Sequence, residues 1–332
     1  MKNLKIFLIS QCHLHDLHLY INGTICFGLP LVWPIECSIC LILSTEHMKT
    51  PIVIILIVFG ISCTRDSQPT NPANDLLSGW RKNFPNRTAA VNALPKKENL
   101  WIFLMAGQSN MAGRGFVEPE DTLPHDRILT VTADRKWVFA KEPLHYYEPR
   151  LKGLDCGLAF GRELLEQVGD SIHIAMLPCA VGGSSIGQWL GDSLHRDVRL
   201  LSNLKGNVDF AQQYGVMKGI LWHQGEKDAR LGLTRSYQKN LKDLIALFRG
   251  YIQNDSVPVI LGELGSNPSD QRDQKNRDAI NRTVWNVAME DKYVGVVSTQ
   301  DLSKRDDDHF DSRSLRIMGK RYAQTFVSLK MK

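Results

Sequence analysis

Two short segments far apart in the chain carry the residue types of nucleophilic catalysis. Ser109 stands in a turn between Gly107 and Gly113, where a hydroxyl can be exposed after a strand ends. A serine hydroxyl is a poor nucleophile at neutral pH and needs a positioned base, most often an imidazole. His309 could be that base, because Asp306 lies three residues ahead of it and can hold the other ring nitrogen. These three side chains predict acyl transfer through Ser109.

Acyl transfer also needs hydrogen-bond donors for the oxyanion that forms on the attacked carbonyl. Gly182 and Gly183 offer backbone N–H groups without side-chain obstruction, and Gln224 offers a side-chain amide. Each of these features has a structural alternative. Ser109 could cap the following helix, the glycines could form a tight turn, and Asp306 could belong to an acidic surface loop.

Metal and nucleotide chemistry have little support in the sequence. His223 and Glu226 lie three residues apart, but neither a His-Glu-x-x-His pattern nor a cysteine–histidine cluster accompanies them. The phosphate-binding glycine patterns of common nucleotide sites do not occur. We therefore expect no metal and no cofactor. Other histidines lie in a strand or in loops without a partner signature, namely His125, His145, His173 and His195.

Strands and helices must alternate to bring these segments together. Short apolar runs predict strands at residues 100–105, 172–177, 219–222, 257–261 and 294–297. Three-to-four spacing predicts helices at residues 158–165, 198–214, 237–248, 280–289 and 315–326. This alternation predicts an α/β fold with about five parallel strands and helices on both faces. Ligands bind at the carboxyl ends of such strands, where the candidate residues cluster.

The composition is that of an ordinary globular protein. Of 332 residues, 43% are hydrophobic and 23% are charged, which excludes disorder, collagen and a coiled coil. The net charge of +5 is not accompanied by a basic run, so nucleic acid is not expected as a partner.

The opening quarter of the chain predicts an export signal instead of a domain. Residues 48–63 combine a cationic start, an apolar run too short to span a bilayer, and small residues before Cys63. This order resembles a bacterial lipoprotein signal, in which Cys63 becomes the lipidated first residue. We expect export across the inner membrane of a bacterium, to the periplasm or as an outer-membrane lipoprotein that contacts the membrane only through its anchor.

The segments around this signal have different predicted roles. Residues 1–47 precede Met48 and are interpreted as an extension from a mis-called start, with a membrane segment at 26–43 as the alternative. Residues 64–99 predict a polar tether or a surface-wrapping segment, and residues 100–332 the catalytic domain. The two cysteines after the signal could form one disulfide or remain as buried thiols; they are Cys156 and Cys179.

Four ordered blocks resemble those of the SGNH hydrolases, named for a Ser, Gly, Asn and His. The chain is most similar to the sialate O-acetylesterase-type domain, which includes the acetylxylan esterases of carbohydrate esterase family six. The blocks read Gly107-Gln-Ser-Asn-Met-Ala-Gly-Arg-Gly115, Pro178-Cys-Ala-Val-Gly-Gly-Ser-Ser-Ile186 with Gln188-Trp189, Trp222-His-Gln-Gly-Glu226 and Asp306-x-x-His309.

The resemblance implies a flavodoxin-like three-layer α/β/α sandwich and a serine esterase that removes O-acetyl groups from carbohydrates, such as acetylated xylan or sialic acid. It implies Ser109 as nucleophile, His309 as general base and acid, and Asp306 as its orienting acid. The implied oxyanion donors are the backbone of Ser109, the backbone of Gly183, and Gln224 in place of the third-block asparagine.

Further residues of these blocks are expected behind the catalytic groups or against the substrate, namely Gly182, Glu226, Arg114 and Trp189. The chain departs from the family pattern at Lys227, where a small hydroxyl residue is usual, and at Asp307 and Asp308, where a glycine is more usual. The alternatives in function are a glycan-binding lipoprotein without catalysis and an SGNH lipase or thioesterase.

Overall fold

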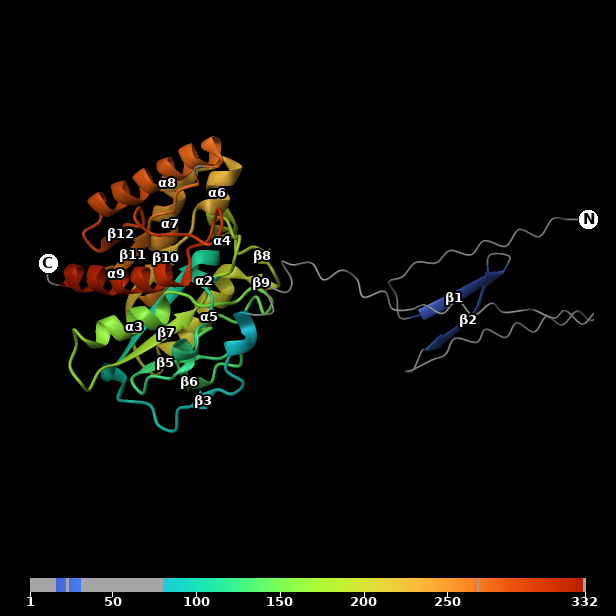
Figure 1. Ribbon diagram of the computed structural model, residues 1–332, viewed down its shortest axis with the longest axis horizontal. Coiled ribbons are helices and arrows are strands. Elements are labelled where there is room, and N and C mark those ends of the chain that lie inside the picture. Colours follow the sequence, from blue (N-terminus) through green and yellow to red (C-terminus); the bar gives the residue numbers. More distant parts are fainter. Residues whose placement is uncertain (1–15, 22–23, 31–79, 268, 331–332) are drawn as a thin grey trace, which may run out of the picture. The chain divides into compact units, whose positions relative to one another are not determined.

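The computed structural model describes residues 16–21, 24–30, 80–267 and 269–330 (Figure 1). The chain divides into two units, residues 1–66 and residues 67–332. In the first unit, β1 (Asp16–Ile21) pairs with β2 (Thr24–Pro30) as an antiparallel hairpin. The predicted signal at 48–63, with Cys63, lies outside the described residues.

One eight-stranded sheet forms the centre of the second unit, in the order β12-β11-β10-β4-β7-β5-β6-β3. Neighbouring strands from β12 to β5 pair in parallel, whereas β6 and β3 add antiparallel strands at one edge. The strands are β3 (Ala89–Ala90), β4 (Leu100–Gly107), β5 (Ile128–Val131), β6 (Trp137–Phe139), β7 (His173–Pro178), β10 (Val216–His223), β11 (Val259–Gly262) and β12 (Val294–Val297).

All five predicted strands are present, and their spatial order β7-β4-β10-β11-β12 is the flavodoxin-like order. The predicted α/β fold is therefore confirmed. The strand β5, which lies beside β7, extends the parallel set by one. It escaped prediction because no amphipathic helix separates it from β4, so it stands outside the strand–helix alternation.

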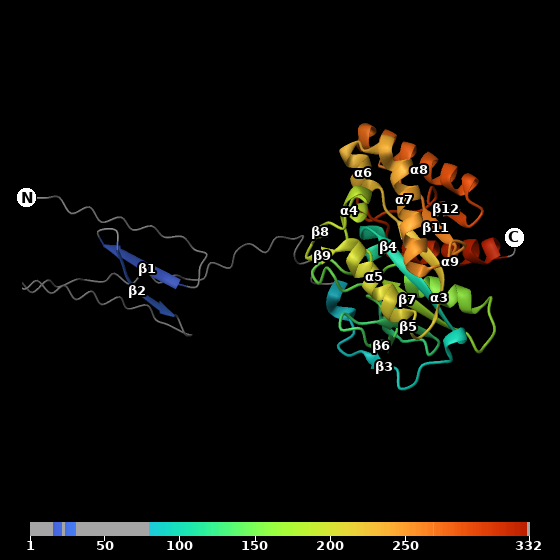
Figure 2. The same ribbon diagram turned by 180° about the vertical axis from the view of Figure 1, so that it is seen from behind.

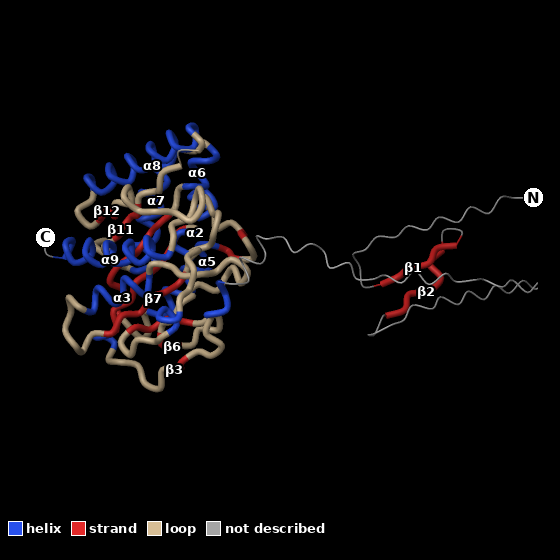
Figure 3. Tube along the Cα trace, viewed as in Figure 1, coloured by secondary structure: helices blue, strands red, loops and turns tan. Residues whose placement is uncertain are grey.

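Helices cover both faces of the sheet, which gives the three expected layers (Figure 3). Apolar residues of α5 (Leu200–Ala211), α7 (Thr234–Ile252) and α8 (Gln271–Glu290) pack in one core cluster, together with α4 (Ile186–Leu190). Those of α3 (Gly157–Leu165) and α9 (Ser312–Lys330) pack in the cluster on the opposite face. Figures 1 and 2 view these two faces in turn. The predicted helices are all found.

The described part of the predicted tether follows the surface of the domain. Residues 80–99 include η1 (Trp80–Asn83), β3 and η2 (Lys97–Asn99). The Asn83 side chain donates a 2.9 Å hydrogen bond to the carbonyl of Val117, and β3 pairs with β6. Sheet pairing therefore begins ahead of residue 100.

Cys156 and Cys179 are both free and buried, so the thiol alternative holds for this pair. Among the described residues, no helix has the length and apolar content needed to cross a bilayer.

Along the chain, β7 and then β10 are added on opposite sides of β4 in the sheet. The strand order therefore reverses at β4, and a crevice forms there at the carboxyl ends of the strands. The segment after β4 carries Ser109, and the segment after β7 carries Gly183. The short helix α6 (Glu226–Leu231) follows β10. The loop with His309 follows β12 and enters α9. The four sequence blocks therefore meet at one edge of the sheet.

Candidate active site

The nucleophile turn is fixed by backbone contacts with the neighbouring strand. Gly107 has a φ of +132°, and a Cβ at this position would lie 2.1 Å from the carbonyl oxygen of His223. The N–H of Gln108 donates to the same carbonyl at 2.9 Å. Only glycine permits this approach, and the chain then enters α2 (Ser109–Ala112). Ser109 is consequently 7% exposed, at the first position of a helix.

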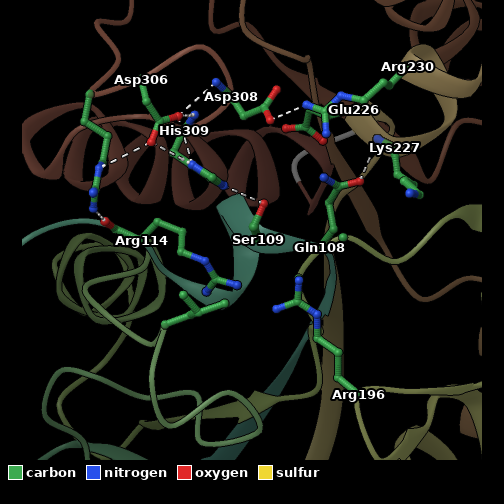
Figure 4. A pocket seen from close by; sticks show the side chains of 14 residues that line it. Gln108, Ser109, Arg114, Arg196, Glu226, Lys227, Arg230, Asp306, Asp308 and His309 are labelled. Carbon is green, nitrogen blue, oxygen red and sulfur yellow. Dashed lines mark hydrogen bonds and ion pairs between the residues drawn. The ribbon is translucent and has the colours of Figure 1, made fainter. Parts of the chain in front are cut away.

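The predicted triad is assembled in the structure (Figure 4). His309 Nε2 lies 3.1 Å from Ser109 Oγ, and His309 Nδ1 lies 2.9 Å from the carboxylate of Asp306. The same carboxylate accepts hydrogen bonds from the backbone N–H groups of His309, at 2.8 Å, and Asp308, at 3.0 Å. Asp306 therefore shapes the loop and orients the imidazole at once, so that Nε2 can take the serine proton.

The electrostatics keep Asp306 ionised. Partial burial raises the pKa of its carboxyl, but the hydrogen bond and charge of His309 and the two backbone N–H groups outweigh burial and hold the pKa well below its ordinary value. A carboxylate that stays charged stabilises the imidazolium that forms when His309 accepts a proton.

A second acid on this loop, Asp308, fixes the loop from outside. Its carboxylate binds Arg230 of α6 and accepts a hydrogen bond from Arg277 of α8. Arg277 is fully buried, and it also binds Asp273, at 2.6 Å, and the carbonyl of Gly265, at 3.0 Å. Asp308, one of the two acids that depart from the family pattern, thus anchors residues 306–309, the catalytic loop, through ion pairs.

Asn110 joins the nucleophile turn to the catalytic loop. Its amide donates to the carbonyl of Asp308, at 3.0 Å, and its carbonyl oxygen accepts from the N–H of Phe310, at 3.1 Å. The same amide donates to Glu226 at 2.6 Å. Asn110 is 1% exposed, so these bonds form inside the protein and set the spacing between Ser109 and His309.

The structure contradicts Gln224 as an oxyanion donor. Its side-chain amide nitrogen already donates to Asp228 at 2.6 Å, to the carbonyl of Ser184 at 3.0 Å and to the carbonyl oxygen of the Gln108 side chain at 3.2 Å. The residue is 1% exposed and does not line the pocket around Ser109. A buried amide with three acceptors cannot turn to an oxyanion without leaving those acceptors unpaired.

Gln108 offers the side-chain amide in its place. Its carbonyl oxygen accepts from Lys227 N–H, at 3.2 Å, and from Gly225 N–H, at 3.4 Å, as well as from Gln224. The amide nitrogen of Gln108 is on the opposite side of the carboxamide, and the residue lines the pocket beside Ser109 (Figure 4). Neighbouring N–H groups therefore occupy the oxygen of this carboxamide and leave its nitrogen as a candidate donor at the pocket.

The two glycines after β7 have different roles. The Gly182 N–H donates to Glu148 at 2.7 Å, which removes it from the candidate oxyanion donors. The Gly183 N–H has no acceptor in the described part of the chain, and Gly183 lines the pocket with a φ of +72°. The Ser109 N–H, at the start of α2, also lacks an acceptor within its helix. The N–H groups of Ser109 and Gly183 are thus both open to an oxyanion, and their role as its donors stays a prediction.

Glu226 lies at the base of the pocket and is 2% exposed. It contacts His223 at 3.2 Å and accepts from Asn110. Burial raises the pKa of Glu226, but the charge and hydrogen bond of His223 and the charge of Arg277 outweigh burial and lower the pKa to about 2. Its role is to hold the surrounding groups in place.

Arg114 and Trp189 were both expected behind the catalytic groups or against the substrate, and of the two only Arg114 lines the pocket. Arg114 lines the pocket and binds Glu148 at 2.7 Å. Trp189 is fully buried and donates to Ser184 Oγ at 2.9 Å, so it cannot contact a substrate. Its ring packs edge-on against Trp222, as a core residue behind the glycine turn.

A cavity of about 270 Å³ opens at these residues. The triad residues occupy one side, and basic side chains contribute to much of the remaining wall (Figure 4). The basic residues are Arg114, Arg196, Lys227, Arg230 and Arg305. The arrangement of nucleophile, base, orienting acid and N–H donors around a polar cavity can perform acyl transfer to a serine. Within the described residues, no group of three metal-binding side chains gathers.

Several residues of this site were not predicted from the sequence. Gln108 and Asn110 stand beside Ser109 in the first block, and this position was the only available signal. Arg277 and Glu148 carried none, because the site residues that they hold, Asp308 and Gly182, lie more than thirty positions away.

Comparisons with known proteins agree with this geometry. A family model described as carbohydrate esterase, sialic acid-specific acetylesterase matches residues 99–328. The probable carbohydrate esterase At4g34215 of Arabidopsis thaliana is 33% identical over an alignment of 177 residues, which covers 48% of this chain and 66% of the relative, slightly under two thirds of its length. Its solved structure has a TM-score of 0.59 at 28% identity and covers 70% of this chain and 99% of its own.

Two further solved structures share the fold. NanS has a TM-score of 0.55 at 17% identity, covering 72% of this chain and 99% of its own. The carbohydrate acetylesterase XAC1771 from Xanthomonas citri has a TM-score of 0.50 at 18% identity, covering 68% of this chain and 55% of its own.

Proposed function

Because the chain belongs to the carbohydrate esterase, sialic acid-specific acetylesterase family, we propose that it is a serine esterase that hydrolyses O-acetyl groups of carbohydrates. The observation that carries this proposal is the line of contacts from Asp306 through His309 to Ser109, at 2.9 and 3.1 Å, at the wall of a polar cavity. A glycan-binding protein without catalysis has no need of a base within hydrogen-bond distance of a serine in the pocket wall.

The reaction follows from these positions. Ser109 Oγ attacks the acetyl carbonyl while His309 Nε2 takes its proton, and Asp306 stabilises the imidazolium. The oxyanion is met by the N–H groups of Ser109 and Gly183 and by the Gln108 side-chain amide. The imidazolium then protonates the sugar oxygen, which leaves as an alcohol, and the acetyl group stays on Ser109. Water, deprotonated by His309, attacks the acetyl-enzyme and releases acetate.

The substrate class is an O-acetylated sugar, of a plant polysaccharide such as xylan or of sialic acid. The cavity supports a hydrophilic substrate, because five basic and three acidic side chains line it. The names of the relatives, a carbohydrate esterase and a carbohydrate acetylesterase, support the same class. Acetate release from acetylated xylan, mannan, pectin and O-acetyl sialic acid, measured side by side, identifies the sugar.

Replacement of the nucleophile tests the reaction itself. Ser109→Ala is expected to lower kcat on an acetylated sugar by roughly 10⁶-fold, because no alternative nucleophile replaces the hydroxyl. The melting temperature should stay near that of the parent protein, and a fluorophosphonate probe should label the parent but not the variant. Undiminished acetate release by Ser109→Ala would refute the proposal.

We further propose that the protein is exported and anchored through a lipid on Cys63. The support is the sequence alone, with an apolar run and small residues ahead of that cysteine. Cys63→Ser is expected to move the protein from the membrane fraction to the soluble fraction and to abolish incorporation of labelled palmitate. Equal membrane recovery of both forms would contradict the anchor.

A further inference from the structure

We propose that His195 is a positioning residue of the oxyanion hole, which aims the Gly183 N–H at the reacting centre by holding the carbonyl of Gly182. This inference rests on the proposed function, because it assigns a role within the same site. His195 does not line the cavity. Its effect on the reaction must therefore pass through the peptide group between the two glycines.

The imidazole of His195 is a hydrogen-bond donor to this peptide. Its Nε2 lies 2.9 Å from the carbonyl oxygen of Gly182, which can only accept. On the other side of the ring, the amide nitrogen of Gln188 lies 3.4 Å from Nδ1. The carbonyl oxygen of Gln188 is engaged by the N–H of Ser185, at 2.9 Å, which leaves its nitrogen to face the ring. Gln188 thus donates to Nδ1, which leaves Nε2 as the ring nitrogen that donates to Gly182.

The geometry of a trans peptide converts this contact into an orientation. Glu142–Pro143 is the cis peptide in the described part of the chain, so the bond between Gly182 and Gly183 is trans. The C=O and N–H of a trans peptide point in opposite directions. Because the carbonyl faces His195, the Gly183 N–H faces away from it. Gly183 lines the cavity and His195 does not, which places that N–H on the cavity side.

The neighbouring peptide is held as well. The N–H of Gly182 donates to Glu148, whose carboxylate also binds Arg114 and Arg196. A Cβ on Gly182 would lie 2.2 Å from an Arg114 nitrogen and 2.7 Å from a Glu148 oxygen, so a larger residue would displace this ion pair. With the N–H bound to Glu148 and the C=O bound to His195, Gly182 has little freedom to rotate. The oxyanion donor is therefore fixed before substrate arrives.

A short hairpin brings His195 to this position. The strands β8 (Leu194–His195) and β9 (Val198–Arg199) are joined by Arg196 and Asp197, which have φ values of +48° and +62°. Two left-handed residues in succession form the tight turn that suits a hairpin, although neither is a glycine. Such backbone strain persists where tertiary contacts hold it, and here Arg196 binds Glu148 while His195 binds Gly182.

Oxyanion donors act on the transition state more than on the bound substrate, so kcat should change and KM should not. The side chain of glutamine can place an amide nitrogen close to the position of His Nε2, whereas asparagine reaches only the position of Nδ1. We therefore expect His195→Gln to keep kcat on p-nitrophenyl acetate within about three-fold of the parent. His195→Asn and His195→Ala should lose roughly 10- to 100-fold in kcat, less than removal of a donor itself.

The matched control is His173→Ala. His173 begins β7 at the opposite end of the sheet. Among the described residues its side chain bonds only to the carbonyl of Ser171, at 3.2 Å, so its replacement should leave kcat at the parent value. A role confined to holding the hairpin would lower the melting temperature in all three His195 variants and would give no preference for glutamine over asparagine. Equal kcat values in the glutamine and alanine variants would overturn the proposal.

An aryl boronic acid gives a second readout, because it forms a tetrahedral adduct on Ser109 that places an oxygen in the oxyanion hole. Its affinity should fall with kcat in His195→Ala and recover in His195→Gln. Parent protein that hydrolyses no acetyl ester and binds no boronate would refute the proposed function itself. Active parent protein with boronate affinity unchanged in His195→Ala would refute only the role of His195.

Discussion

The two sides of the catalytic site are held in place by different forces. Ser109 follows a buried strand and is fixed by backbone contacts of Gly107 and Gln108 with His223. His309 and Asp306 lie on a surface loop, with side chains 25% and 44% exposed. Side-chain hydrogen bonds and ion pairs hold that loop. Substitutions in the backbone turn that fixes Ser109 should therefore damage the fold, whereas substitutions of the side chains that hold His309 should damage catalysis first.

The largest effect is expected for Gly107→Ala, on the side of the site held by backbone. A Cβ at Gly107 would lie 2.1 Å from the carbonyl oxygen of His223, and the φ of +132° is strained for alanine. Strain and overpacking together should cost roughly 3 kcal/mol or more of unfolding free energy, and activity should be lost with the fold. Urea denaturation and the soluble yield measure this.

The control for that substitution is Gly250→Ala. Gly250 lies within α7, and a Cβ there meets nothing within 4 Å. Alanine should stabilise the helix by about 0.5–1 kcal/mol. If Gly107→Ala kept the parent stability, the assignment of backbone contacts as the force that holds Ser109 would be wrong.

The next effect is expected for Asp306→Asn, on the loop side. An amide can present its N–H₂ to His309 Nδ1 and so favour the tautomer that leaves Nε2 protonated, unable to accept from Ser109. We expect kcat to fall by roughly 10²- to 10⁴-fold with the melting temperature nearly unchanged. Asp307→Asn, at an exposed neighbour, should leave kcat near the parent value. Near-parent activity in Asp306→Asn would remove Asp306 from the triad.

A smaller effect is expected for Asp308→Asn, which removes one charge from the ion-pair anchor. Arg277 is fully buried but keeps Asp273 and the carbonyl of Gly265, so the loss of stability should be about 1–2 kcal/mol. The looser loop should lower kcat several-fold, since small displacements of a base reduce the rate. Steady-state kinetics and urea denaturation, again beside Asp307→Asn, separate this anchor from a general effect of charge.

The structural features that depend on a local sequence pattern could be predicted from the sequence. The strand that ends at Gly107, the serine after it and the Asp306–His309 pair are each readable within a few residues. The choice between the amides of Gln108 and Gln224 as oxyanion donor could not be predicted, because it depends on what surrounds each amide in the fold. Gln224 lies next to Asp228, four residues on in α6, which takes its amide hydrogen. Gln108 keeps its own donor for the cavity because distant backbone N–H groups occupy its oxygen.

Glu226 carries a buried charge next to the Ser109 side of the site, the side that backbone contacts hold in place. Its pKa is lowered from 4.5 to about 2, so in acid the unfolded chain takes up a proton before the folded chain does. The stability that the ionised carboxylate contributes is complete above about pH 4.5 and is lost as the pH falls toward 2. Glu226→Gln lacks this titration.

The unfolding free energies of the parent and Glu226→Gln should therefore differ more at pH 7 than at pH 3, with the parent the more stable at pH 7. Urea denaturation at both pH values measures the difference, and Asp307→Asn, at an exposed acid, should show no such change. A difference that stays constant between the two pH values would mean that Glu226 holds Asn110 and His223 by shape and hydrogen bonding alone, without a contribution from its charge.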